Sequence, residues 1–173
     1  PTRRSSDLGN DSFSGTGGKD SIDGGASSGD ADLVTYAYLD SGTTGVSVSV
    51  NSDGTLKGSI SVSDIDTLIN IEALAGSKNN DSIDLTGYSR AMSVAAGEGN
   101  NTLLGGSSDD TLTATGGNNF FDGGAGNNSM AGGAGKLPVP YSMNAARSRL
   151  KDEPPPKTYR GSLNFEMGVL NKS

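Results

Sequence analysis

A nine-residue repeat of glycine-rich turns and single apolar residues is the feature that most limits what this chain can fold into. From Gly87 the sequence divides into units of nine without a gap. The units are Gly87–Ala95, Ala96–Leu104, Gly105–Thr113, Ala114–Asp122 and Gly123–Ala131, and Gly132 begins a sixth. Position 8 is apolar throughout, held by Val94, Leu103, Leu112, Phe121 and Met130. A short fixed period of this kind is typical of a solenoid, in which each unit packs only against its neighbours.

The same frame recurs nearer the N-terminus. The units Gly15–Asp23 and Gly76–Asp84 keep it, and Gly9 begins a half-unit before the first of them. Position 6 in these units is held by Asp11, Asp20 and Asp81, and position 8 by Phe13, Ile22 and Ile83. Because side chains alternate along a strand, the last three positions predict a short strand with one inward residue. The first six predict a tight turn, in which glycine allows left-handed dihedrals.

These units match the pattern G-G-x-G-x-D-x-U-x, where U is a large apolar residue. Over roughly residues 9–135 the chain therefore resembles the RTX, or haemolysin-type calcium-binding, repeat family. The resemblance implies an all-β fold, a right-handed parallel β-roll in which two nonapeptides form each turn. It also implies Ca²⁺ as the bound cofactor, held between turns that stack on the same side. Turn carbonyls and an aspartate at position 6 are oxygen ligands of the kind that calcium prefers.

The resemblance marks turn glycines and position-6 side chains as candidate calcium ligands. The candidates are Gly9, Asp11, Gly15, Gly17, Asp20, Asp32, Asp81, Gly105, Asp110, Gly123 and Asn128. Consecutive units fall on opposite sides of the roll, so Asp11 needs a partner from an adjacent turn, and Asp32 is expected to be one. Any site is expected to be weak, with a Kd on the order of 10⁻⁴–10⁻³ M.

The longest block of repeats departs from the pattern at position 6. Asn101, Asn119 and Asn128 replace aspartate there, and Met92 is not a useful calcium ligand. Asparagine keeps one oxygen but loses the charge that sets calcium affinity. With alternate units on one side, Met92, Asp110 and Asn128 are expected to form one row, and Asn101 and Asn119 the other. The alternative use of these asparagines is a hydrogen-bonded ladder that needs no ion.

The two ends differ from the repeat-bearing body. Residues 1–8 resemble a translated sequencing adapter and are expected to be foreign to the native protein, with a short basic leader as the alternative. Residues 136–173 are Pro-rich, hold little glycine and are expected to form a disordered tail. The body divides into N-terminal repeats at 9–31, a β-strand spacer at 32–75 and C-terminal repeats at 76–135. Within the spacer, alternating apolar and serine residues around Asn51–Gly54 predict a hairpin.

Charge and composition limit the partners. Residues 9–135 hold 16 Asp and Glu against four Lys and Arg, a net of −12 in a chain whose total is −7. Such a body repels phosphate, so no nucleic acid partner is expected, and no apolar run is long enough to span a membrane. The chain has no His and no Cys, which excludes zinc-protease His pairs and His-dependent triads within it. We expect no enzymatic activity in this chain, although a missing part of its parent could be an enzyme.

Two function hypotheses follow. In the first, the chain is a calcium-binding structural repeat module of a secreted bacterial protein, and it folds on calcium binding outside the cell. The resemblance leaves the type I secretion machinery open as a partner of the parent protein. In the second, the chain is a calcium-independent β-solenoid spacer or adhesin segment, held by apolar stacking and asparagine ladders. Neither hypothesis names a cell-surface or matrix partner.

Overall fold

The computed structural model describes residues 2–4, 9–15, 17–26, 29–39, 44–61 and 64–132. The regular structure in these ranges is entirely β. The strands are β1 (Thr2–Arg4), β2 (Ser12–Ser14), β3 (Ser21–Asp23), β4 (Leu33–Thr35), β5 (Ser47–Val50), β6 (Leu56–Ser61), β7 (Asp64–Ile69), β8 (Ala73–Ala75), β9 (Ser82–Asp84), β10 (Ser93–Ala95), β11 (Thr102–Leu104), β12 (Thr111–Thr113), β13 (Phe120–Asp122) and β14 (Ser129–Ala131). In these ranges no helix is long and apolar enough to cross a membrane. The expected tail at 136–173 lies outside the described residues.

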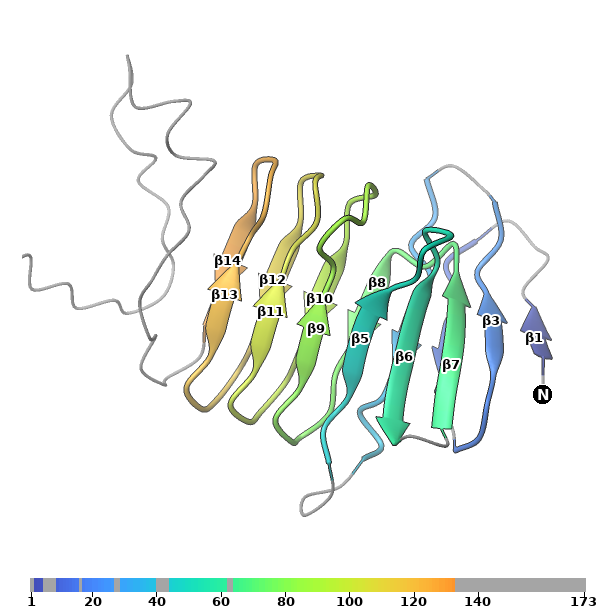
Figure 1. Cartoon of the computed structure of the whole chain (residues 1–173), viewed down its shortest axis with the longest axis horizontal. Coiled ribbons are helices and arrows are strands. Elements are labelled where there is room, and N and C mark those ends of the chain that lie inside the picture. The colour runs from blue at the N-terminus through green and yellow to red at the C-terminus, as the bar shows by residue number, and fades with distance from the viewer. Residues whose placement is uncertain are drawn as a thin grey trace, which may run out of the picture.

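The strands form two sheets, and the chain passes back and forth between them (Figure 1). The first sheet has the order β1-β3-β7-β6-β5-β9-β11-β13, and the second has the order β14-β12-β10-β8-β4-β2. From β8 to β14 each strand pairs in parallel with the second strand after it. Val94 lies beside Leu112, and Leu112 beside Met130, so each step across the second sheet is two repeat units. The repeats therefore wind as a flattened coil with two nonapeptides per turn.

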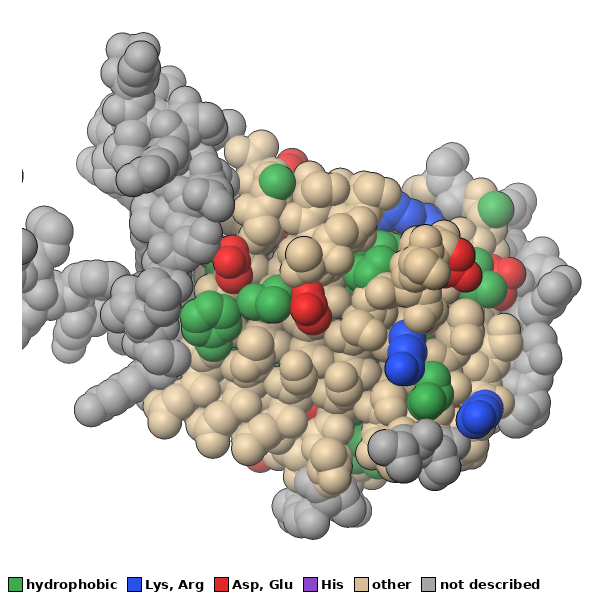
Figure 2. Space-filling view, viewed as in Figure 1, with side chains coloured by type: hydrophobic (Ala, Val, Ile, Leu, Met, Phe, Trp, Pro, Cys, Tyr) green, Lys and Arg blue, Asp and Glu red, His purple; other side chains and the backbone are tan. Residues whose placement is uncertain are grey.

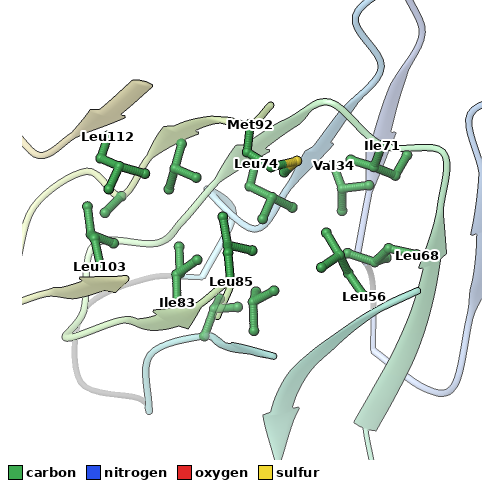
Figure 3. Packing of buried hydrophobic residues seen from close by; sticks show 14 of the residues in the cluster. Val34, Leu56, Leu68, Ile71, Leu74, Ile83, Leu85, Met92, Leu103 and Leu112 are labelled. Carbon is green, nitrogen blue, oxygen red and sulfur yellow. The ribbon is translucent and has the colours of Figure 1, made fainter. Parts of the chain in front are cut away.

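Position 8 of each unit supplies the core between the two sheets. Leu103 and Leu112 are fully buried, and Ile83 is 1% exposed. Figure 3 shows Leu103 and Ile83 of the first sheet facing Leu112 and Leu74 of the second, with Met92 beside Leu74. The outward neighbours on the same strands are mostly small and polar, such as Ser82, Thr102 and Thr111, and they are exposed because side chains alternate along a strand. Their hydroxyls leave most of the face in Figure 2 neither charged nor apolar.

The spacer adds an antiparallel hairpin to the first sheet. β5 pairs antiparallel with β6, and β6 with β7, while β5 also pairs in parallel with β9 and β7 with β3. The hairpin predicted around Asn51–Gly54 is confirmed, with Gly54 at φ 84° in its turn. The hairpin interrupts the parallel pairing of the repeats in this sheet, because strands joined by a tight turn must run antiparallel. The first sheet is mixed and the second is parallel throughout.

The hairpin makes the first sheet wider than the second, in which β4 and β8 are direct neighbours. Tyr36, which follows β4 and is 1% exposed, fills the added space. A Cβ on Gly15 would come within 2.2 Å of the Tyr36 ring, and one on Gly58 within 2.1 Å of its hydroxyl. These two glycines are therefore required by the packing of one aromatic side chain.

Neighbouring leucines on β11 test the burial pattern. Leu103→Ala is expected to lower the free energy of unfolding by about 2–5 kcal/mol, because it empties a filled site in the core. Leu104→Ala is the matched control and should cost about 1 kcal/mol or less, since Leu104 lies on the outward face and is only half-buried. Urea denaturation followed by circular dichroism, at one fixed calcium concentration, measures both. Equal losses would contradict the inward and outward assignment.

Candidate functional site

Position-6 side chains connect successive turns of the coil. In each case the side-chain oxygen accepts a hydrogen bond from the backbone N–H of position 6 one turn earlier. On one side Met92 N–H donates to Asp110 Oδ1, and Asp110 N–H donates to Asn128 Oδ1, both at 2.8 Å. On the other side Asn101 N–H donates to Asn119 Oδ1 at 2.9 Å. The two rows predicted from the spacing of the units are confirmed.

The rows continue through the N-terminal turns. Asp11 N–H donates to Asp32 Oδ1 at 2.8 Å, so Asp32 is the neighbour of Asp11 in the adjacent turn, as expected. Asp32 N–H then donates to Glu72 Oε2 at 3.1 Å. On the opposite side Asp20 N–H donates to Asp66 Oδ1 at 2.9 Å. Carboxylates that belong to different turns are therefore stacked on both sides of the coil.

Asp66 and Glu72 were not predicted as members of these rows. They lie in the spacer, which has no nonapeptide register. Asp66 lies two residues before Leu68, and Glu72 lies two residues before Leu74. Both leucines are inward apolar residues, because Leu68 pairs with Ile22 and Leu74 pairs with Val94. The acid-x-apolar triplet is the part of the repeat that survives in the spacer. This triplet is the sequence signal that could have identified both residues.

Both rows change from carboxylates to amides along the chain. One side holds, in order, Asp11, Asp32, Glu72, Met92, Asp110 and Asn128. The other side, interrupted by the hairpin, holds Asp20, Asp66, Asp81, Asn101 and Asn119. Beyond β9 only Asp110 keeps a carboxylate at this position. The carboxylates of the two rows are therefore concentrated in the N-terminal turns.

Exposed side chains at position 5 form a second ladder in the opposite direction. Asn80 Oδ1 accepts the N–H of Asn100, and Asn100 Oδ1 accepts the N–H of Asn118, both at 2.7 Å. Asp109 Oδ1 accepts the N–H of Asn127 at 2.7 Å on the other side. Where both positions 5 and 6 hold Asx residues, successive turns are thus bridged once at the surface and once inside.

Aspartate at position 6 also closes its own turn. The second carboxylate oxygen, Oδ2, accepts the N–H of position 2, which is Ser77 for Asp81 and Gly106 for Asp110, at 2.8 Å in both turns. The glycine at position 1 makes room for this oxygen. A Cβ on Gly76 would come within 2.3 Å of Asp81 Oδ2, and one on Gly105 within 2.8 Å of Asp110 Oδ2.

Asparagine at position 6 closes its turn in a different way. Its Nδ2 group donates to the carbonyl oxygens of positions 3 and 4 of the same unit. The distances are 3.1 and 3.5 Å from Asn101 to Glu98 and Gly99, 2.9 and 3.4 Å from Asn119 to Gly116 and Gly117, and 3.0 and 3.5 Å from Asn128 to Ala125 and Gly126. Asn128 Nδ2 also donates to the carbonyl of Gly123 at 2.6 Å.

The candidate ligands fall into separate groups. Gly105, Asp110, Gly123 and Asn128 come together in two stacked turns, where a Cβ on Gly105 would lie 2.5 Å from the Gly123 carbonyl. Gly9 lies in the Asp11 turn. Gly17 and Asp20 share a turn beside Asp64, and Asp81 lies in another turn on that side. Gly15 does not join any group, because its carbonyl accepts the Tyr38 hydroxyl and its Cα faces Tyr36.

The Asp11 turn fits a cation. Asp11 Oδ2 is buried and accepts no hydrogen bond from the part of the chain that the structure describes. A buried carboxylate oxygen without a donor is costly, and a calcium ion would satisfy it. Asp32, the stacked neighbour, is 2% exposed. Over the described ranges no three Asp or Glu side chains converge on one point as a metal cluster, so turn carbonyls would have to complete any coordination shell.

Burial makes the Asp66 carboxylate unfavourable in its charged form. Its Oδ2 accepts the hydroxyl of Tyr36 at 2.9 Å. Burial raises the pKa of Asp66 above its usual value, and the neighbouring carboxylates of Asp20 and Asp64 raise it further. Burial, followed by the charge of Asp66, raises the pKa of Tyr36 far above that of an ordinary tyrosine. Burial also raises the pKa of Asp81.

A two-sheet coil with stacked acidic turns is a β-solenoid with rows of carboxylates in its turns. The family model of the RTX calcium-binding nonapeptide repeat (4 copies) matches residues 6–28, 93–121 and 104–136. The chain therefore contains RTX calcium-binding nonapeptide repeats. This family is a structural calcium-binding repeat rather than a catalytic domain. Asp66, Glu72 and Asp81 lie outside the matched segments. No curated protein matches the chain.

The raised pKa of Asp66 gives a pH dependence with a definite sign. The folded protein binds this proton more tightly than the unfolded chain, so charged Asp66 lowers stability above its folded pKa and the cost disappears on protonation. Asp66→Asn should therefore be more stable than wild type at neutral pH without calcium. The advantage should vanish as the pH falls to about 4, measured by urea denaturation at a series of pH values.

Asp53→Asn is the control of opposite sign. Hydrogen bonds from Thr55 lower the pKa of Asp53 at the exposed hairpin turn. Charged Asp53 therefore adds stability at neutral pH, and its replacement should reduce stability there. If the stability difference between Asp66→Asn and wild type did not change with pH, the buried carboxylate would not be the source.

Proposed function

We propose that this chain is a calcium-binding structural module of a secreted RTX-type protein. In this proposal it forms a right-handed parallel β-roll that folds when calcium binds outside the bacterial cell. The observation that carries the proposal is the Asp11 turn, whose buried Oδ2 accepts no hydrogen bond from the described residues while Asp32 stacks directly upon it. The matched repeats at residues 6–28 include this turn.

The turns that hold carboxylates are the ones we assign to the ions. On one side these are the turns of Asp11, with Gly9 and Asp32, and of Asp110, with Gly105. On the other side they are the turns of Asp20, with Gly17, and of Asp81. Bound calcium would neutralise the carboxylates and hold turn carbonyls in place. The protein orients these oxygens through the hydrogen bonds that link position 6 of successive turns.

Electrostatic repulsion supports folding that depends on calcium. The repeat-bearing body carries 16 acidic against four basic residues, and its carboxylates are stacked in rows. Like charges at this spacing oppose the compact state until cations bind, and any ion that binds only the folded form stabilises it. A chain that stays unfolded at low calcium is also suited to export through type I secretion machinery, which places the folded module outside the cell.

The asparagine turns favour a second candidate function. Asn101 and Asn119 link their turns and close them with hydrogen bonds that need no ion. A chain held in this way throughout would be a calcium-independent solenoid spacer or adhesin segment. The two functions differ in their response to chelator, because only the first loses strand structure when calcium is removed.

Calcium titration of the full chain tests the proposal. Strand signal in circular dichroism and heat of binding should both appear at about 10⁻⁴–10⁻³ M calcium. The Asp11→Asn, Asp32→Asn double variant should shift the midpoint to higher calcium, because it removes two charges from one row. The matched control is Asp84→Asn, Asp122→Asn, which removes two charges from turns where the side chain only caps the N–H two residues later.

The control variant should titrate like wild type. A wild-type spectrum that is identical in chelator and in millimolar calcium, with no heat of binding, would overturn the proposal and leave the calcium-independent solenoid.

A further inference from the structure

We propose that the turns of Asn101, Asn119 and Asn128 are closed by their own side-chain amide in the place of a metal ion. The C-terminal part of the coil, residues 96–131, then keeps its fold without calcium. The assignment of ions to the acidic turns rests on the proposed function, but the closure of the asparagine turns does not.

The amide group is placed where a cation would serve the same oxygens. In each of the three turns Nδ2 donates to the carbonyls of positions 3 and 4. An amide nitrogen carries two hydrogens and cannot accept, so it satisfies carbonyl oxygens as a positive ion would. Turn carbonyls of this kind are among the oxygen ligands that a calcium ion takes. The oxygens that it would need are already engaged.

The orientation of the amide is determined by its neighbours. Asn119 Oδ1 accepts the backbone N–H of Asn101 at 2.9 Å, and Asn128 Oδ1 accepts that of Asp110 at 2.8 Å. A backbone N–H requires an oxygen, so the other terminal atom, which faces two carbonyls, must be the nitrogen. Aspartate has no such hydrogens: in the turns of Asp81 and Asp110 the second oxygen accepts the N–H of position 2, so the position-6 side chain donates nothing to the carbonyls of positions 3 and 4.

Position 1 differs between the aspartate turns and the turns of Asn101 and Asn119. The aspartate turns begin with Gly76 and Gly105, where a Cβ would fall within 2.8 Å or less of the aspartate Oδ2. The turns of Asn101 and Asn119 begin with Ala96 and Ala114, whose side chains are buried in the core, whereas the turn of Asn128 begins with Gly123. Two coordinated differences in two separate units define a second type of turn, rather than an aspartate turn that has lost its charge.

The turn of Met92 also needs no metal ion, but for a different reason. Met92 is 2% exposed and belongs to the core. Arg90, two residues earlier, donates from its guanidinium to Glu72 Oε1 at 2.5 Å and to Asn70 Oδ1 at 3.0 Å. The last carboxylate of the N-terminal row is therefore paired with a cation that the chain itself supplies. A positive group of the protein stands at the boundary between the acidic and the amide turns.

Amide hydrogen exchange on the full chain in chelator tests the inference directly. Strands β11, β12 and β13, and the N–H of Asn101, should stay protected in chelator to within about threefold of their protection in millimolar calcium. Equal loss of protection in these strands and in the N-terminal strands on removal of calcium would overturn the proposal.

Rebuilding two turns as aspartate turns tests the role of the amide. The variant Ala96→Gly, Asn101→Asp, Ala114→Gly, Asn119→Asp should exchange at least tenfold faster than wild type in β11 and β13 in chelator, and millimolar calcium should restore the protection. Ala96→Gly, Ala114→Gly keeps both amides and controls for the glycines. Asn100→Asp, Asn118→Asp adds the same two charges at exposed position 5 of the same turns.

Both controls should stay protected in chelator. If the rebuilt variant is as protected in chelator as the glycine control, the amide is not what closes the turn, and the proposal fails. The proposed function has a separate test in the same experiment. It fails if calcium does not slow the exchange of the wild-type N-terminal amides around Asp11 and Asp20. The two ideas can therefore be rejected separately.

Discussion

The hydrogen bond from the backbone N–H at position 6 to the side-chain oxygen one turn later is the interaction on which the rest of the structure depends. Backbone hydrogen bonds link successive turns at the strands and at positions beside them, as from Thr111 N–H to the Met92 carbonyl. A buried N–H at position 6 that was left without a partner would cost about 1–3 kcal/mol. An Asx or Glu side chain one turn later supplies the acceptor, except where Met92 follows Glu72 and where the hairpin separates Asp66 from Asp81, whose Oδ1 accepts the N–H of Val46.

This requirement explains why aspartate and asparagine can replace one another without disturbing the coil. Either residue offers one oxygen to the preceding turn. The two residues differ in their second terminal atom. In asparagine this atom is a nitrogen that faces the carbonyls of its own turn, and in aspartate it is an oxygen that faces an N–H group. The backbone path is thus common to all units, while the identity of one atom decides whether a turn leaves room for a cation. A gradient from carboxylate to amide along the chain can therefore set where ions act without any change of fold.

Much of this organisation could be predicted from the spacing of residues within the repeat units. Register and an apolar position 8 predicted the coil, the inward side chains and the two rows, since these follow from strand alternation and from two units per turn. The hairpin was accessible from its turn residues. Asp66 and Glu72 were missed because their row membership depends on β7 and β8 lying beside β3 and β10, across a spacer that has no period. Tyr36 was missed as well, because the space that it fills exists only once two extra strands widen the first sheet.

By itself the sequence determined the period of the coil, the inward position of each unit and the acidic character of its N-terminal turns. These properties depend on neighbours along the chain, and local spacing is sufficient to specify them. Only the tertiary structure decided which carboxylates stack, that Gly15 packs against Tyr36, and that the asparagine amides donate to the carbonyls of their own turns. Each of these depends on atoms brought together from separate turns or across a turn, where direction as well as distance determines whether an oxygen meets a proton donor or another oxygen.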